Sequence, residues 1–568
     1  MARIILMLAI AGFATNTLAQ NTTAISIDEL WDRYVGNVST YPISTTVEPV
    51  PVPSASLTSP PPLYYPPLPF PGGAQVPLQV RNESWAFPKT FWRGVAGSAF
   101  QTEGAVKAEG RGPSIWDVLT RVPGYIKHNE TADIADWHYY LYKQDIARIA
   151  ALGINTYAFT ISWSRIMPYG SGEVNQEGLQ HYDDVIDTCL KYGVNPVVTM
   201  YHWDLPLNLQ LAYGGWLDEQ IISDFTEYAR TLFTRWHSKV QFWVTVNEPS
   251  VFCGNYPLPE GYFNDSTAHD IPSDEQLYTC ARNVLLAHAS AYHLGRSINS
   301  SLGISFKNNG GYKIPVDNTT ETAAAIQRAY DFNEGIWATP VFLTGDFPES
   351  VKEYVSGFLQ PFTAEQKAEI NGTSDFFMID AYGVGGFITA PGDGGLEACL
   401  SNTSHSAYPH CYGSVSTYPG ADYWPTGPAV DPGGSWLEYG TDWITTMLRT
   451  YQDMYRPADV SIVLTKTFFR KGGIVISEFG LPEPYENLRT DILSVVIDPI
   501  RSRYYREYLE SILMALAEGI NVVGTISWSI FDNFEWDQGT TCRYGIQDRY
   551  FKASAFEYIN MFNIYQET

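Results

Sequence analysis

The sequence predicts an α/β protein: a single closed (β/α)₈ barrel with long βα-loop insertions and a Pro-rich N-terminal extension. Two observations predict this fold. Short apolar runs rich in β-branched and aromatic residues recur eight times, as is typical of parallel strands buried on both faces. Amphipathic stretches separate several of these runs, which indicates repeated strand–helix units. An ordinary doubly wound sheet is the alternative, because the number of strands alone does not exclude it.

The predicted elements follow in chain order. Strands are expected at 91–97, 154–162, 194–201, 240–247, 302–306, 376–382, 473–478 and 521–528. Amphipathic helices are expected at 140–152, 182–192, 220–237 and 502–518. In a barrel of the TIM type, the loops at the C-terminal strand ends build the active site, so polar residues that end a strand become candidates.

The N-terminal region predicts export. Residues 1–19 combine Arg3 with an apolar run at 4–11 and small residues before Ala19, the pattern of a signal peptide. The apolar run is too short for a hydrocarbon layer of ~30 Å, and no later segment reaches the length of a membrane span. Asn-x-Ser/Thr sequons recur along the chain, as in a secreted glycoprotein. We therefore expect an extracellular location.

Residues 20–85 form the predicted extension, and residues 86–568 form the predicted barrel domain. Twelve prolines between 41 and 77 favour extended polyproline II over packed helix or sheet. The extension is either a linker or an arm laid along the barrel with Tyr64, Tyr65 and Phe70 as anchors. We favour a partly docked arm.

Composition excludes several classes of protein. The chain of 568 residues has 35 Lys+Arg against 61 Asp+Glu, a formal net charge of −26. Such a charge repels nucleic acid and anionic membrane surfaces, so neither is an expected partner. A hydrophobic content of 45% excludes global disorder, and aromatic residues at 14% exceed what a core needs. No His-x-x-His motif, Cys cluster or Gly-rich phosphate loop predicts a metal or cofactor.

Two glutamates end predicted strands: Glu248 follows the fourth and Glu478 ends the seventh. A single carboxylate in such a position is usually a helix cap or a salt-bridge partner. A pair with Asn, Gln, His and Trp side chains on the same barrel face is what glycoside hydrolysis requires. One carboxyl protonates the departing oxygen, while the other attacks the sugar or deprotonates water. Aromatic rings then offer stacking surfaces for sugar CH faces.

Six segments resemble glycoside hydrolase family 1, the β-glucosidase-like (β/α)₈ barrels. They read FWRGVAGSAFQTEGA, TISWSRIMP, YHWDLP, TVNEP, ISEFG and SWSIFDNFEWDQGTTCRYGI, in family order. The resemblance implies a retaining, exo-acting enzyme of secreted, fungal type. Its substrate is a small-molecule or oligosaccharide β-glycoside, most readily a terminal β-D-glucoside.

The resemblance also implies residue roles. Glu248 is expected to be the general acid/base and Glu478 the nucleophile, with carboxyl groups ~5–5.5 Å apart. Other matched positions are expected to contact substrate or shape its pocket: Gln101, His202, Asn247, Tyr382, Trp528, Glu535, Trp536 and Tyr544. Tyr382 matches the tyrosine that orients the nucleophile, and Tyr544 stands where Phe is usual. Trp163 is open between a core role and a site role.

Three positions depart from the family pattern. Ala158 replaces an arginine that normally lies near the nucleophile, Lys307 stands after strand five where Asn is more usual, and Asp380 replaces another Asn. We hypothesise that Lys307 supplies the missing positive charge with Asp380 as its partner. The alternative is that Lys307 points to solvent. Phe479 also departs from the usual sequence after the nucleophile.

In a secreted chain, Cys399 and Cys411 could close a short loop, and Cys253 could pair with Cys280; Cys542 is unassigned, and the sequence alone leaves the connectivity open. Cys189 lies in a helical pattern and is expected to be a buried thiol. A protein of another class, a catalytically impaired sugar-binding or receptor-like barrel, is the alternative function. Within the enzyme class, β-galactosidase or β-fucosidase activity is a further alternative.

Overall fold

The computed structural model describes residues 25–58, 85–256, 258–259, 262–263, 271–415, 437–456, 472–547 and 550–567. The predicted signal peptide at 1–19 lies outside the described residues, as do the proposed anchors Tyr64, Tyr65 and Phe70. No helix in the described ranges is long and apolar enough to cross a membrane.

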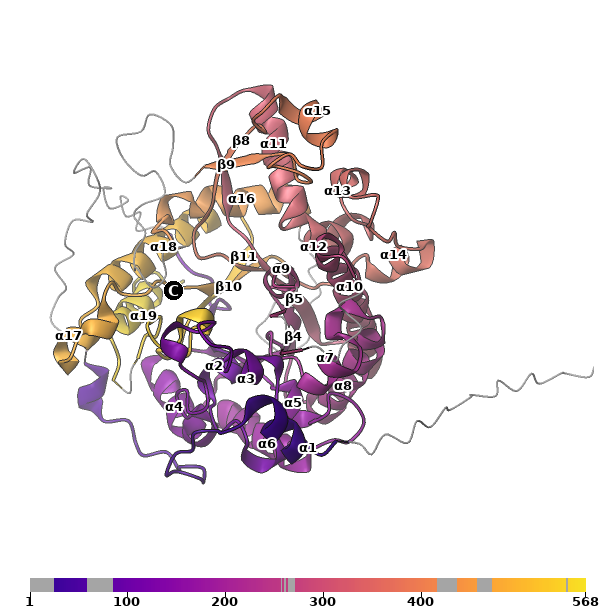
Figure 1. Ribbon diagram of the computed structural model, residues 1–568. Helices are drawn as coiled ribbons and strands as arrows, with labels where there is room; N and C mark the ends of the chain where they lie inside the picture. The colour runs from indigo at the N-terminus through magenta and orange to yellow at the C-terminus, as the bar shows by residue number, and fades with distance from the viewer. Residues whose placement is uncertain are drawn as a thin grey trace, which may run out of the picture.

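Eight parallel strands close into a barrel in the order β1-β11-β10-β7-β5-β4-β3-β2 (Figure 1). The predicted barrel is therefore confirmed, and the doubly wound alternative is wrong. The strands are β1 Trp92–Gly97, β2 Thr156–Thr160, β3 Asn195–Tyr201, β4 Phe242–Asn247, β5 Gly303–Asn309, β7 Phe377–Asp380, β10 Ile474–Phe479 and β11 Val522–Ser527. The fifth strand continues to Asn309, three residues past its predicted end at 306.

Helices surround the barrel, and the four predicted helices are present. The ends of three lie within three residues of the prediction, whereas α6 begins six residues before its predicted start at 182. The longer helices are α4 His138–Leu152, α6 Gln176–Lys191, α8 Gln220–Trp236, α10 Ser273–Ile298, α11 Thr320–Phe332, α16 Ile444–Tyr455, α18 Pro499–Ala517 and α19 Ala553–Ile564. The shorter helices are α1 Ile27–Leu30, α2 Ala99–Thr102, α3 Ile115–Leu119, α5 Trp163–Ile166, α7 Leu207–Tyr213, α9 Pro249–Gly254, α12 Gly335–Thr339, α13 Glu349–Tyr354, α14 Ala364–Ile370, α15 Gly395–Leu400 and α17 Ile492–Val496.

Local sequence explains where these helices begin and end. The side chain of Asn175 caps α6 by accepting a hydrogen bond from the backbone N–H of Glu177. Buried residues of α6 then recur at helical spacing, from Leu179 through Tyr182 and Ile186 to Cys189. This apolar stripe packs α6 against the barrel.

A layer of aromatic rings fills the N-terminal end of the barrel interior. Trp92, at the start of β1, lies 4.7 Å from Phe242 at the start of β4 and 5.5 Å from Phe376, just before β7 (ring centroids). Because β1 and β4 are not neighbours in the barrel, these contacts cross its interior. The N-terminal end is thus packed, and a site has room only at the C-terminal end.

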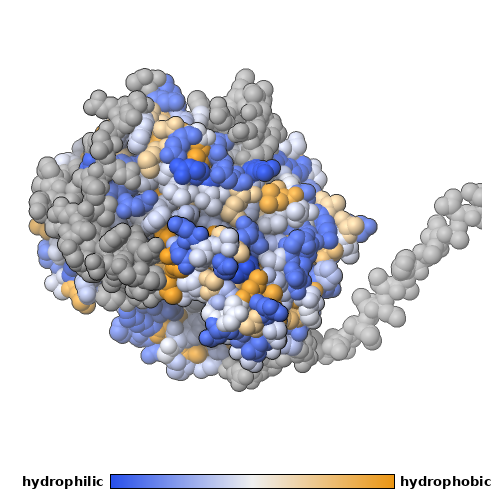
Figure 2. All heavy atoms as spheres, turned by 90° about the horizontal axis from the view of Figure 1, so that it is seen from above, coloured by the Kyte–Doolittle hydropathy of each residue, from blue (hydrophilic) through white to orange (hydrophobic). Residues whose placement is uncertain are grey.

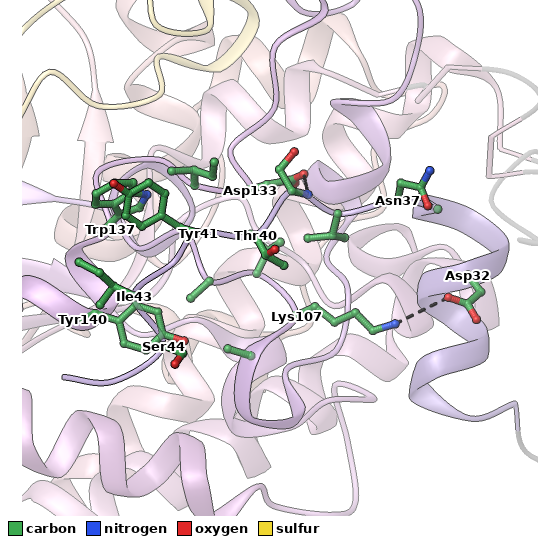
Figure 3. Close-up of a pocket in the computed structure, with 17 residues that line it drawn as sticks. Asp32, Asn37, Thr40, Tyr41, Ile43, Ser44, Lys107, Asp133, Trp137 and Tyr140 are labelled. Carbon is green, nitrogen blue, oxygen red and sulfur yellow. Dashed lines mark hydrogen bonds and ion pairs between the residues drawn. The ribbon is translucent and has the colours of Figure 1, made fainter.

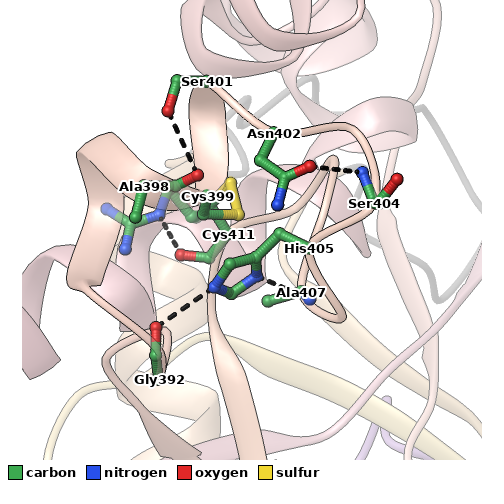
Figure 4. Close-up of a disulfide and its surroundings, with 10 residues drawn as sticks. Gly392, Ala398, Cys399, Ser401, Asn402, Ser404, His405, Ala407 and Cys411 are labelled. Atoms are coloured by element: carbon green, nitrogen blue, oxygen red, sulfur yellow. Dashed lines mark hydrogen bonds between the residues drawn. A yellow bond between two sulfur atoms is a disulfide. The ribbon is translucent and has the colours of Figure 1, made fainter.

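A second, three-stranded sheet rises from the loops after β5 and β7, and the sequence pattern did not predict it. It consists of β6 Tyr312–Pro315, β8 Val384–Thr389 and β9 Gly413–Val415, in the order β6-β8-β9. Figure 1 shows β8 and β9 beside α11 and α15 at the top of the view. The Cys399–Cys411 disulfide closes the segment between α15 and β9, and Arg328 of α11 donates to the backbone oxygen of Cys411 (Figure 4).

Both predicted disulfides are present in the structure. The second, Cys253–Cys280, joins α9 to α10. Cys189 is a buried thiol, as predicted, and Cys542 is buried outside the two disulfides.

The described part of the N-terminal extension lies against the barrel. Trp31 is completely buried and donates from Nε1 to the backbone oxygen of Arg111 at 2.9 Å. Further along, the backbone N–H of Ser39 donates to Asp133 at 2.8 Å. Extension and barrel enclose a cavity of about 570 Å³, at which Tyr41 lies over Trp137 (Figure 3). In the view of Figure 2, hydrophilic residues cover much of the described surface, with apolar residues between them.

Candidate active site

A cavity of about 640 Å³ lies at the C-terminal end of the barrel strands. Both candidate catalytic glutamates line it, and aromatic rings form much of its wall. The residues that line it include Trp116, Tyr125, His202, Trp203, Glu248, Asn255, Asn309, Tyr382, Glu478, Trp528, Glu535, Trp536 and Gln538.

Glu248 and Glu478 face each other across this cavity. Glu248 directly follows β4, and Glu478 lies in β10; the two residues are only 5% and 3% exposed. Their carboxylate oxygens lie within 4.8 Å of each other and of an Asp380 oxygen. Such a separation leaves no space for a water molecule between a nucleophile and a bound sugar, which favours retention over inversion.

Two groups hold Glu478 in place. Tyr382, just after β7, donates from its hydroxyl to Oε2 at 2.9 Å, which is the contact that the resemblance implied. Lys307 donates from Nζ to Oε1 at 2.6 Å. Lys307 and Tyr382 reach the carboxylate of Glu478 because β5, β7 and β10 are successive strands of the barrel.

Glu248 has a different environment. Asn309 donates from Nδ2 to its Oε1 at 2.7 Å. Burial, together with repulsion from Asp380 and Glu478, raises the pKa of Glu248 well above its usual value. The carboxyl therefore keeps its proton to higher pH than an ordinary glutamic acid does, as a general acid must.

The far end of the cavity is built around Glu535. Burial raises the pKa of this carboxyl from 4.5 to about 8. It accepts hydrogen bonds from Trp528 Nε1 at 3.4 Å and from Gln101 Nε2 at 3.5 Å. The ring of His202 stacks between Trp528 and Trp536, with both centroids 5.7 Å away. Burial and the charge of Lys307 lower the pKa of His202 well below its usual value, so the imidazole is neutral.

The structure brings the predicted site residues together, although not all of them reach the cavity surface. His202, Tyr382, Trp528, Glu535 and Trp536 line the cavity. Gln101, Asn247 and Tyr544 are completely buried behind it; Asn247 approaches His202 at 3.4 Å, and Tyr544 packs edge-on against Tyr382.

Trp163 belongs to the hydrophobic core and not to the cavity wall. Its ring is completely buried and stacks on Tyr228 at 4.9 Å. Ala158 is buried in β2.

Lys307 does not point to solvent, so that alternative is wrong. It is 2% exposed, and Nζ lies 4.0 Å from Asp380 as well as 2.6 Å from Glu478. It also lies within β5 rather than after it, and the same strand supplies the asparagine, Asn309, two residues later. Among the described residues, Glu248, Asp380 and Glu478 have the spacing of metal ligands. Lys307 already provides the positive charge that an ion would bring there.

Sequence reasoning missed several residues at the cavity. Asn309 lay beyond the predicted strand end, although residues two apart on a strand share a face, and this alternation links it to Lys307. Trp116, Tyr125, Asn255 and Gln538 come from loops and short helices, for which no strand-end pattern exists.

Comparisons with known proteins agree with this geometry. The sequence profile described as "Glycosyl hydrolase family 1" matches residues 83–557. The chain belongs to this family. It is thus a glycoside hydrolase with the family's closed α/β barrel.

Curated relatives are similar over most of their length. Coniferin β-glucosidase of Pinus contorta is 33% identical over 496 residues, which cover 83% of this chain and 90% of that protein. β-Glucosidase 24 of Oryza sativa subsp. japonica is 35% identical over 475 residues, covering 81% and 88%. These relatives support a retaining β-glucosidase, and neither alternative function is better supported.

Solved structures are similar as well. A family 1 β-glucosidase from the fungus Humicola insolens, in complex with glucose, has a TM-score of 0.75 at 29% identity and covers 85% of this chain and 100% of its own. A mutant rice β-glucosidase in a covalent complex with glucose has a TM-score of 0.74 at 29% identity, with coverage of 85% and 100%.

Proposed function

We propose that the protein hydrolyses terminal, non-reducing β-D-glucosyl residues by double displacement, with Glu478 as nucleophile and Glu248 as general acid/base. The observation that carries this proposal is the pair itself. The two carboxyl groups lie close together in one cavity. An ion pair with Lys307 and a hydrogen bond from Tyr382 hold Glu478, whereas burial and like charges favour the protonated form of Glu248.

In the first half-reaction, a Glu478 oxygen attacks the anomeric carbon while the glycosidic C–O bond breaks. Glu248 donates its proton to the departing oxygen. The hydrogen bond from Tyr382 fixes the orientation of the attacking carboxylate. In the second half-reaction, ionised Glu248 removes a proton from water, which displaces Glu478 and releases the sugar with its configuration retained.

The inner cavity supplies the sugar subsite. Trp528 and Trp536 offer apolar faces, and Glu535 offers hydrogen-bonding oxygens to sugar hydroxyls. Asn247 stands beside Glu248 and is proposed to bond the 2-hydroxyl, although its amide now lies behind the cavity surface. Its Oδ1 is buried without a hydrogen-bond partner, so it has spare capacity for a ligand.

The testing experiment is hydrolysis of a panel of aryl β-glycosides by the wild type, Glu478→Ala and Glu248→Ala. Wild type should prefer the glucoside, and both variants should lose at least about 10³-fold in kcat/KM. Added azide should give the α-glucosyl azide with Glu478→Ala and the β-glucosyl azide with Glu248→Ala, because each cavity admits the anion on a different face of the sugar. Glu518→Ala, at an exposed helix end, is the matched control.

Two results would contradict the proposal. Full activity in Glu478→Ala would remove the nucleophile assignment, and absence of hydrolysis in the wild type would favour a sugar-binding protein. A preference for the galactoside or the fucoside would identify the protein as a β-galactosidase or β-fucosidase instead of a β-glucosidase.

We also propose that the protein is a secreted glycoprotein of fungal type. The pattern of residues 1–19 and the two disulfides support export. The similar solved structures include one from the fungus Humicola insolens, beside rice and Thermotoga maritima proteins of the same identity, so the fungal type stays a prediction. Expression in a fungal host tests export: the mature chain should be in the medium and begin near Gln20, whereas an intracellular full-length chain would contradict it.

A further inference from the structure

Lys307 stands among three buried carboxyl groups. Glu478 and Asp380 lie 2.6 and 4.0 Å from its ammonium, and Glu248 completes the cluster. The four residues come from β4, β5, β7 and β10 or their ends, which are consecutive around the barrel. Lys307, Asp380 and Glu478 are each at most 3% exposed, so water screens their charges little.

One cation cannot balance three anions in such a site, so two of the carboxyl groups keep their protons. Burial alone would lower the pKa of Lys307, but attraction to Asp380 and Glu478 raises it above the usual value. Burial and repulsion from Glu478 raise the pKa of Asp380 well above its usual range. The resting cluster therefore holds charged Lys307, ionised Glu478, and protonated Glu248 and Asp380.

We propose that Lys307 and Asp380 form a charge-balancing pair for the two glutamates: Lys307 offsets whichever glutamate is ionised in each half-reaction, and Asp380 is a third, proton-carrying acid that extends activity to higher pH. Both are positioning residues. This inference rests on the proposed roles of Glu248 and Glu478.

The charges balance through the reaction. Before the first step, the cluster contains Lys307⁺ and Glu478⁻. As the bond from Glu478 to the anomeric carbon forms and the glycosidic bond breaks, the proton of Glu248 leaves with the departing oxygen. The cluster then contains Lys307⁺ and Glu248⁻, while Glu478 is a neutral ester. Addition of water reverses these changes, so a single ammonium serves both half-reactions.

Asp380 affects the alkaline limb of the pH–rate profile. Ser477 donates to its Oδ1 at 2.6 Å, and its buried Oδ2 has no hydrogen-bond partner. When Asp380 loses its proton at high pH, its new charge repels ionisation of Glu248, which keeps the general acid protonated. Other titratable groups around the cluster are Tyr382 after β7, His202 after β3, Glu535 after β11 and Tyr508 of α18, which lies near Asp380.

The test is the pH dependence of kcat/KM on an aryl β-glucoside for the wild type, Lys307→Met and Asp380→Asn. Lys307→Met should move the acidic limb upward by about one pH unit or more, because Glu478 loses its cation. The alkaline limb of this variant should also shift to higher pH, because the charge of Lys307 lowers the pKa of Glu248 in the wild type. Asp380→Asn should shift the alkaline limb of the profile to lower pH. The acidic limb should stay at the same pH, because Asp380 is already neutral there.

Lys313→Met is the matched control. Lys313 is also a buried lysine, but it pairs with Glu334 at 3.1 Å and does not line the cavity. Its variant should keep both limbs. Lys307→Arg, which retains the charge, should keep the acidic limb near that of the wild type.

Unchanged limbs in Lys307→Met would overturn the role of Lys307, and an unchanged alkaline limb in Asp380→Asn would overturn that of Asp380. If thermal unfolding shows that Lys307→Met does not fold, Lys307→Gln supplies the neutral side chain and is held to the same outcomes. A wild type without activity at any pH would instead contradict the proposed function, so the two failures are distinguishable.

Discussion

Asn309 donates a hydrogen bond to Glu248 from the strand that also carries Lys307 to Glu478. Because Lys307 and Asn309 are two residues apart, one face of β5 orients both glutamates. Phe306, on the opposite face, contacts the ring of His288 in α10 at 5.0 Å. The outer face of β5 thus fixes the strand, while its inner face holds the reacting pair.

Asn309→Ala should lower kcat because Glu248 loses the contact that orients its proton. We expect a decrease of about tenfold, equivalent to ~1.4 kcal/mol. The alkaline limb should rise, since this hydrogen bond lowers the pKa of Glu248. Steady-state kinetics on substrates with good and poor leaving groups checks this: the poor leaving group, which needs the acid, should suffer more. Equal losses on both substrates would contradict it, and Asn308→Ala, on the outward face, is the control for strand damage.

Glu535→Gln should change how stability depends on pH. Burial raises the pKa of Glu535 from 4.5 to about 8 in the folded protein. Between these values the unfolded chain has lost the proton and the folded chain keeps it, so the wild type loses stability as pH rises through this range. Glu535→Gln has no carboxyl to titrate at this position, so it should lose less folding stability than the wild type as pH rises.

Thermal unfolding midpoints at pH 4 to 9 measure the effect. The midpoint of Glu535→Gln relative to wild type should increase from pH 5 to pH 8, although its activity falls. Parallel curves would contradict the prediction, and Glu518→Gln, at an exposed position, is the control.

Apolar runs made the barrel predictable, because strands buried on both faces leave a continuous signal. Glu248 and Glu478 were predictable because a polar residue at the end of an apolar strand stands out, and such strand ends meet at one face of the barrel. Asn309 was missed because the apolar signal stops where β5 begins to face the cavity, and the strand continues in polar residues. The sheet of β6, β8 and β9 was missed because β6 and β9 have only four and three residues, and because β8 and β9 contain glycine, which weakens a strand pattern.

The two disulfides should differ in their effect on catalysis. Cys253 lies in α9, directly after Glu248, and ties this helix to α10. Replacing Cys253 and Cys280 together by Ser should lower stability by about 2–4 kcal/mol and also reduce kcat, because the segment that carries the acid loses its support. The measurements are thermal unfolding and steady-state kinetics.

The matched control is the double replacement of Cys399 and Cys411. This pair lies beside β9, away from the residues that line the cavity. It should lower stability and leave kcat within about twofold, a difference of ~0.4 kcal/mol. Equal losses of kcat in both double variants would show that α9 needs no covalent support.

Trp31 should make the extension a structural part of the barrel. The residue is completely buried. Arg111, whose backbone oxygen accepts the Nε1 hydrogen bond, pairs through its guanidinium with Asp117 of α3 at 3.0 Å. Ile27, Leu30 and Trp31 are spaced so that one helical face meets the barrel. Trp31→Ala should cost about 3–5 kcal/mol of stability, because a large cavity is left in a packed region.

Trp31→Phe separates packing from hydrogen bonding. It retains most of the ring volume and loses the bond to Arg111, so about 1 kcal/mol should be lost. Denaturant unfolding of both variants measures the difference, and kcat at low temperature should be unchanged, since Trp31 does not line the cavity. Equal stability of Trp31→Ala and wild type would show that the extension rests on the barrel without supporting it.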